Sequence, residues 1–181
     1  LDLLRGFAAF AMIVDHVGGR DSWLYAVTGG NRFFVSAAEA YVKFAPESKE
    51  AEGYLRKALD IDPKNGKAAF HLARLLRRTK RWAELAALLE QRAELSGTIE
   101  EKIASLLSLA DVARAHLGED GVVRADAAIK RVLQLDPAQP QALRAITDQL
   151  VSAQNWLALV GAYQAALKAR REHEDIGMLL Q

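Results

Sequence analysis

The chain has 181 residues, of which 51% are hydrophobic and 26% are charged, a composition typical of a folded protein with a buried core. Its 24 Lys and Arg residues nearly balance its 23 Asp and Glu residues, so no global charge directs it to nucleic acid or to an anionic membrane. The absence of Cys excludes disulfides, thiolate nucleophiles and thiolate metal ligands.

The first predicted element is an apolar helix in the stretch LDLLRGFAAFAMIVDHV. Its apolar residues nearly encircle a helix, which predicts burial on most sides. Only nine uncharged residues, positions 6–14, separate Arg5 from Asp15, whereas a membrane span needs about 20 apolar residues. By length alone we therefore expect a buried N-terminal helix. Because the chain begins at Leu1 without an initiator Met, we also expect it to be a fragment of a longer product.

Residues 1–42 resemble the N-terminus of the OpgC-like branch of the membrane acyltransferase superfamily. The likeness rests on LDLLRGFAAFAMIVDHV, SWLYAVT and FFVSAAEAYV, and on Arg5 and His16, which have the spacing of that family's Arg and His on its first transmembrane helix. The resemblance implies acyl transfer, with succinylation of periplasmic glucans in the OpgC branch, and a role for His16 in that reaction. An ionisable side chain at membrane depth is normally functional, because its burial is costly.

The family's pattern ends at Val42, where this chain continues into KFAPESKEAEG rather than into further apolar helices. Without the rest of the bundle no catalytic cavity can form, so we expect no acyl transfer and regard Arg5 and His16 as a remnant. Three explanations of the segment stay open: a natural fusion that has lost its middle, a join introduced by sequence assembly or by the gene model, or the coincidence of a hydrophobic helix. The first two keep a truncated membrane acyltransferase as the alternative function. Membrane association through residues 1–44 thus stays open, whereas the remaining domain alone predicts a cytoplasmic protein.

Residues 45–181 predict an all-α domain. Apolar residues recur at spacings of three and four, as at Leu72, Leu75 and Leu76, and Asp-Pro or Gly clusters interrupt the pattern. We predict helices over 47–61, 66–79, 82–95, 99–117, 122–135, 139–153 and 156–170, with a further start near 172. The short linkers make consecutive helices antiparallel.

An internal repeat organises this domain, because residues 57–93 align without gaps with residues 131–167, at a shift of 74 positions. Pro63 then falls on Pro137, and Trp82 falls on Trp156. A shift of this size corresponds to about two units of the 34-residue class of helical repeats. We expect both Trp side chains to be packed in the core or between repeats, so that truncation of either to Ala costs about 3–5 kcal/mol.

The repeats resemble the tetratricopeptide repeat (TPR) family over residues 46–181. The family's small, large, small and Pro positions are matched best by Ala51, Leu55, Ala58 and Pro63. Looser copies follow at Leu85, Leu89, Arg92 and Gly97, at Ala125, Ile129, Val132 and Pro137, and at Leu159, Tyr163 and Ala166. The resemblance implies antiparallel helix pairs in a right-handed superhelix, here with an extra hydrophobic N-terminal helix, acting as a non-catalytic scaffold for protein–protein interaction.

In such repeats the first helix of each pair lines a concave groove, and the resemblance places eight candidate residues there. They are Lys67, Phe70, Arg74, Arg77, Asp111, Arg114, Arg144 and Asp148. These eight residues include five cations and two anions, so the groove carries a net positive charge. We therefore predict a protein or peptide partner that is acidic or ends in a carboxylate, which Arg side chains can hold bidentately. A competing interpretation of RLLRRTKR is a solvated helix end whose cations complement the helix dipole, and we apply it to Lys80 and Arg81.

The repeats carry no sequence motif of an enzyme, a cofactor site or a metal site. A phosphate-binding Gly loop, a paired-His signature and a Gly-x-Ser-x-Gly elbow are all missing, so we expect neither cofactor nor metal. His71, His116 and His173 are expected to be surface or half-buried helix residues. We expect no nucleic acid partner, since the basic cluster lacks interleaved aromatic residues for base stacking.

Overall fold

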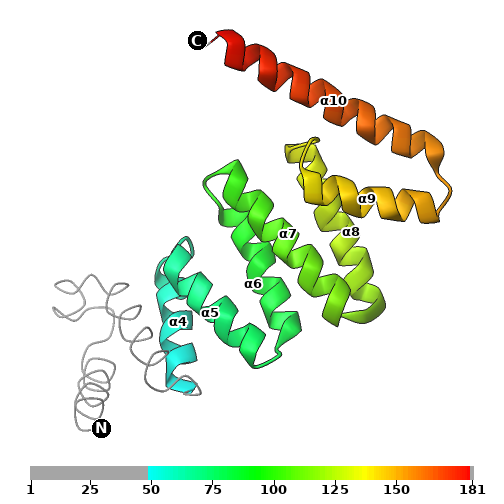
Figure 1. Cartoon of the computed structure of the whole chain (residues 1–181). Helices are drawn as coiled ribbons and strands as arrows, with labels where there is room; N and C mark the ends of the chain where they lie inside the picture. The colour runs from blue at the N-terminus through cyan, green and yellow to red at the C-terminus, as the bar shows by residue number, and fades with distance from the viewer. Residues whose placement is uncertain (1–48, 180–181) are drawn as a thin grey trace. The chain divides into compact units, whose positions relative to one another are not determined.

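The computed structural model describes the backbone of residues 49–179 and the side chains of residues 51–171. Over this range the chain is all-α, as predicted, with seven helices and no strand (Figure 1). The helices are α4 (Lys49–Ile61), α5 (Gly66–Arg78), α6 (Trp82–Leu95), α7 (Ile99–His116), α8 (Gly118–Leu135), α9 (Pro140–Ser152) and α10 (Trp156–Leu179). The chain divides into two compact units, Leu1–Lys80 and Arg81–Gln181, and each is described by itself. Arg5 and His16 lie outside the described residues.

In the first unit α4 packs against α5. Both helices bury a stripe of alanine and leucine side chains, among which Leu55 and Leu76 are almost completely inaccessible. α5 begins at an N-cap, where the side chain of Asn65 accepts a hydrogen bond of 2.9 Å from the N–H of Ala68. Small residues such as Ala58 and Ala68 have no exposed surface, because they let the helix backbones approach closely.

In the second unit each helix packs against the next in the chain, from α6 to α10. Leu85 of α6, Leu106 of α7 and Val132 of α8 are the largest side chains that are completely buried there. Thr98 caps α7 by accepting the N–H of Glu101, and Asn155 caps α10 by accepting the N–H of Ala158. None of the helices between Lys49 and Leu179 is both long and apolar enough to cross a membrane.

The chain reverses between α7 and α8 over Leu117 alone, whereas the sequence predicted a turn lengthened up to residue 121. Two glycines explain the difference. Gly118 has a φ of +63°, which favours glycine, and Gly121 lies so close to α7 that a Cβ would meet the carbonyl oxygen of Ala113 at 2.1 Å. The second helix can therefore start directly at Gly118.

The 74-residue repeat of the sequence is also a repeat of local structure. Asp62 and Asp136, each followed by Pro, accept N–H bonds from the residue two positions on, and α5 and α9 both begin four residues after that Asp. The equivalent residues Lys80 and Gln154, just beyond these two helices, have φ values of +56° and +54°. The repeat predicted from the spacing of Pro and Trp is therefore also seen in the backbone dihedral angles of equivalent residues.

Two expectations for the C-terminal region are wrong. α10 runs without interruption from Trp156 to Leu179, whereas a break and a new start near 172 were predicted. No Gly or Pro occurs between residues 162 and 176 to end the helix. Trp156 was expected to be packed, but it is 58% exposed, whereas the equivalent Trp82 is half-buried.

Candidate functional site

Four of the eight candidate residues share one face of α5, at positions 67, 70, 74 and 77. With 3.6 residues per turn, these spacings place their side chains in a single stripe, which we call the α5 stripe. All four are exposed. The buried residues of the helix lie on the other side and are Ala68, Ala69, Leu72, Leu75 and Leu76.

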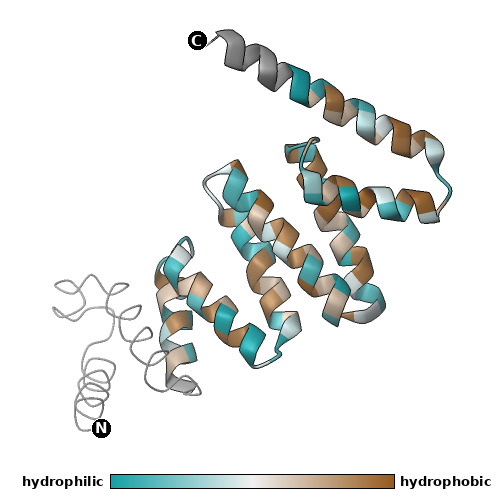
Figure 2. Cartoon of the chain, viewed as in Figure 1, coloured by the Kyte–Doolittle hydropathy of each residue, from teal (hydrophilic) through white to brown (hydrophobic). Residues whose placement is uncertain are grey.

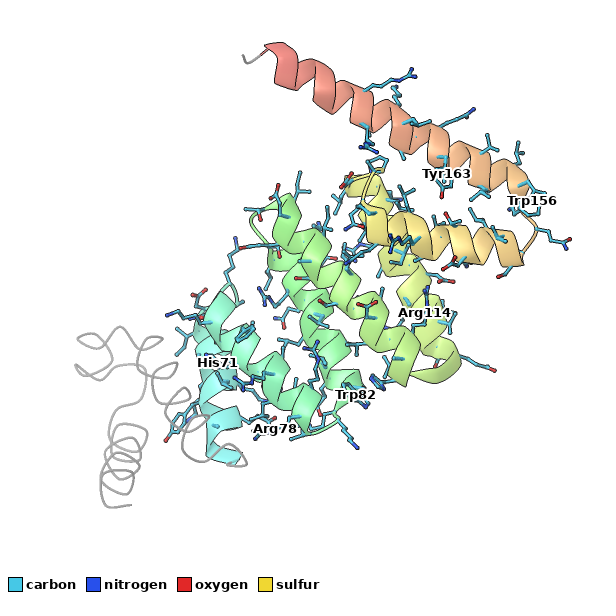
Figure 3. The ribbon with its side chains drawn as sticks, viewed as in Figure 1. His71, Arg78, Trp82, Arg114, Trp156 and Tyr163 are labelled. Atoms are coloured by element: carbon cyan, nitrogen blue, oxygen red, sulfur yellow. The ribbon has the colours of Figure 1, made fainter. Side chains whose placement is uncertain are left out.

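The α5 stripe carries three positive charges, and none of them forms an ion pair within the described part of the chain. Lys67, Arg74 and Arg77 form no salt bridge within residues 51–171. Phe70 stands between them in the sequence and is 59% exposed, with its ring edge-on to His71 at a centroid distance of 5.5 Å. Figure 3 shows His71 and Arg78 of the same helix. The stripe thus combines unpaired cations with an accessible aromatic ring.

Lys80 and Arg81, the two cations assigned to the helix end, differ in position and contacts. The N–H of Lys80 donates to the carbonyl of Arg77 at 3.2 Å and helps to close α5. Arg81 instead precedes α6, where its guanidinium donates two hydrogen bonds of 2.6 Å to the carboxylate of Glu84. Arg81 therefore neutralises an acid in the first turn of α6.

The other four candidates belong to the second unit. Asp111 and Arg114 lie on α7, Arg144 and Asp148 lie on α9, and all four are exposed. They and the α5 stripe are in different units, so the eight-residue groove stays a prediction.

Arg114 is already engaged by an acidic residue that the sequence did not single out. Its Nη2 donates to Oδ1 of Asp126 on α8 at 2.8 Å, and Oδ2 of Asp126 accepts from Nε2 of Gln149 on α9 at 2.7 Å. Asp126 thus connects three consecutive helices. An acidic ligand would have to compete with Asp126 for Arg114, whereas Arg144 forms no salt bridge within the described side chains.

Two further ion pairs join α6 to α8. Arg124 donates to Glu90 at 2.8 Å, and Arg131 donates to Glu94. The hydrogen bond and the charge of Arg131 lower the pKa of Glu94, and the charge of Lys102 on α7 lowers it further. A search for opposite charges about 34 residues apart, the repeat length, could have found both pairs. Asp126 offered no such signal, because its role depends on how three helices meet.

His71 and His116 are the two histidines whose side chains the structure describes. His71 is half-buried and His116 is exposed, as expected, and His116 stacks on Trp82. The side chain of His173 lies outside the described residues. Among the side chains that the structure describes, no group of three or more acidic, His or Cys residues could hold a metal ion. Sequence comparisons find no protein-family model and no curated protein that matches this chain.

Proposed function

We propose that this chain is a TPR-like scaffold without a catalytic role, whose helix pairs stack into a right-handed superhelix and bind an acidic segment of a partner protein. Two features support the superhelix. The local structure repeats after 74 residues, at caps, turns and positive φ angles alike. In the copy that matches the repeat pattern best, the small and large positions Ala51, Leu55 and Ala58 are completely buried.

The observation that carries the proposed activity is the α5 stripe. Arg74 and Arg77 are three residues apart on one face and exposed, so both guanidinium groups can reach the same extended ligand. Each can hold a carboxylate through two parallel N–H···O bonds. Phe70 supplies apolar surface beside them, and this combination suits a peptide with carboxylates flanking an apolar side chain.

The second unit contributes less positive charge to such a ligand. Arg144 is exposed and forms no salt bridge with the described side chains, whereas Arg114 shares its charge with Asp126. We therefore expect the α5 stripe to dominate the affinity and Arg144 to contribute after it. Because the contacts are exposed ion pairs, binding weakens as ionic strength rises.

Charge reversal on the α5 stripe tests this function. The probe is a fluorescein-labelled peptide of alternating Glu and Leu with a free C-terminal carboxylate, titrated with the full chain and followed by fluorescence anisotropy. The double substitution Arg74→Glu/Arg77→Glu is expected to weaken binding about tenfold or more, because attraction becomes repulsion. Arg144→Glu is expected to weaken it less.

A matched control carries the same change of net charge elsewhere. Lys64→Glu/Lys130→Glu alters two exposed lysines outside the candidate set. It should leave the affinity within about twofold at moderate salt, because neither lysine is expected to contact the peptide and salt screens the change in net charge. Equal weakening by the two double variants would mean that only net charge matters, and the proposed stripe would be wrong. Circular dichroism of each variant verifies that the helices remain.

A further inference from the structure

α7, α8 and α9 each carry hydrophilic residues among hydrophobic ones (Figure 2), and three of the polar side chains meet at Asp126. The two oxygens of its carboxylate accept from two different helices: Oδ1 from Arg114 of α7, and Oδ2 from Gln149 of α9. The side chain of Asp126 is 19% exposed, whereas that of Arg114 is 44% exposed. The acid is therefore largely covered, while the cation stays accessible to a ligand.

The contact with Asp126 leaves much of the guanidinium group of Arg114 available. A guanidinium group carries several N–H donors, and the hydrogen bond to Asp126 comes from Nη2. A ligand carboxylate that approaches the accessible part of the group can accept two parallel N–H bonds, which is the stronger arrangement. An exposed ion pair is also readily exchanged, because water and salt screen the attraction between its charges. Arg114 can thus pass from Asp126 to a ligand carboxylate.

Gln149 stabilises Asp126 during such an exchange. A carboxylate that is largely covered is costly to leave without a partner. The side-chain amide of Gln149 donates to Oδ2 of Asp126 at 2.7 Å, whereas Arg114 donates to the other oxygen. Asp126 therefore keeps a hydrogen-bond donor when Arg114 leaves.

We propose that Asp126 is an internal competitor of the acidic ligand: it binds Arg114 in the free protein and releases it when a ligand carboxylate takes its place. Because the ligand is the acidic segment proposed above, this role of Asp126 rests on that function. Asp126 is a positioning residue, since it acts on the ligand through Arg114. The competition lowers the affinity of the second unit for acids. It favours ligands that present a carboxylate to two N–H groups of Arg114 at once.

Removal of the charge at position 126 tests this role by a gain in binding, which a loss of folding cannot produce. The probe is the fluorescein-labelled peptide of alternating Glu and Leu with a free C-terminal carboxylate, titrated with the full chain by anisotropy. Asp126→Asn retains the size of the side chain and an oxygen that can accept from Gln149. It is expected to tighten binding about three- to fivefold, because Arg114 is no longer neutralised before the ligand arrives.

Two control variants separate this role from a change in net charge. Glu119→Gln removes the charge of an exposed acid on the same helix, which forms no ion pair with the described side chains. It should change the affinity less than about twofold at moderate salt. The second control repeats Asp126→Asn in a chain that carries Arg114→Gln. There the gain should disappear, because position 114 no longer has a guanidinium group to release.

Three results would overturn the role of Asp126. Unchanged or weaker binding by Asp126→Asn, with Arg74→Glu/Arg77→Glu still weakening it, would contradict the competition and leave the proposed function intact. An equal gain in the Arg114→Gln chain, or from Glu119→Gln, would mean that net charge explains the effect. Failure of the parent chain to bind the peptide would contradict the proposed function itself, and the competition with it. Circular dichroism verifies that each variant keeps its helices.

Discussion

Trp82 and His116 stack face to face, with their ring centroids 3.7 Å apart and their planes 8° from parallel. Trp82 is the first residue of α6 and His116 the last residue of α7, so one contact joins the start of a helix to the end of its antiparallel neighbour. The equivalent of Trp82 in α10, Trp156, is 58% exposed. Two tryptophans at matching repeat positions therefore have different environments.

This difference predicts unequal costs of truncation. Trp82→Ala is expected to lower the free energy of unfolding by about 2–3 kcal/mol, because it removes a half-buried ring and its stack. Trp156→Ala is expected to cost less than about 1 kcal/mol, as for most exposed positions. Urea unfolding followed by circular dichroism measures both. Trp82→Phe retains an aromatic ring and should lie between the two, and equal losses for the two alanine variants would contradict the assignment.

The close approach of α8 to α7 predicts that Gly121 cannot be replaced. A Cβ at this position would lie 2.1 Å from the carbonyl oxygen of Ala113 and 2.7 Å from Cβ of Leu117, so backbone must move. Gly121→Ala is expected to destabilise the protein by about 1–3 kcal/mol in thermal or urea unfolding. Gly161→Ala provides the control: it is also helical, nothing lies within 4 Å of its Cβ, and it should stabilise by about 0.5–1 kcal/mol. A stabilising effect at both positions would show that the two helices are further apart.

The ion pair between α6 and α8 predicts a pH dependence. Arg131 lowers the pKa of Glu94 below its ordinary value of 4.5, so the folded state holds the Glu94 proton less tightly than the unfolded state. The stabilisation by this pair is therefore complete above the unfolded pKa and is lost as the pH falls through the folded pKa. In Arg131→Gln the pKa of Glu94, followed by NMR, should rise towards 4.5, and the stability difference from the parent chain should vanish in acid.

Arg124→Gln serves as the control for this titration. It breaks the neighbouring pair with Glu90 and should leave the pKa of Glu94 unchanged. A pKa of Glu94 that does not respond to Arg131→Gln would mean that the two side chains are not paired in solution.

Much of the local structure could be predicted from single residues and their spacing. The apolar periodicity located all seven described helices, and most of their ends agree within a residue or two, because Asp-Pro, Asn and Thr act through nearby backbone groups. The repeat of Pro63 and Trp82 at Pro137 and Trp156 correctly indicated equivalent turns. The turn at Leu117 was missed, because its shortness depends on how closely Gly121 approaches α7.

The candidate site was also predictable only in part, because its contacts between helices depend on how the helices pack. The resemblance to TPR repeats grouped Lys67, Arg74 and Arg77, and all three lie exposed on one face of α5. It could not show that Asp126 holds Arg114, since that contact joins residues from helices whose packing is set by the whole unit. The exposure of Trp156 could not be predicted from the sequence either, because the burial of a helix face depends on which helix packs against it.

Which segments are helical, where they repeat and which of their faces are apolar could all be predicted from the amino acids, since each of these depends on interactions within a few turns of chain. The tertiary structure alone decided which apolar faces are covered and which charges are neutralised. These depend on contacts between segments far apart in the sequence, such as α6 with α7 and α8. Trp82 and Trp156 occupy the same position in the repeat, yet among the described side chains a neighbouring helix stacks a ring against Trp82 and none does so against Trp156.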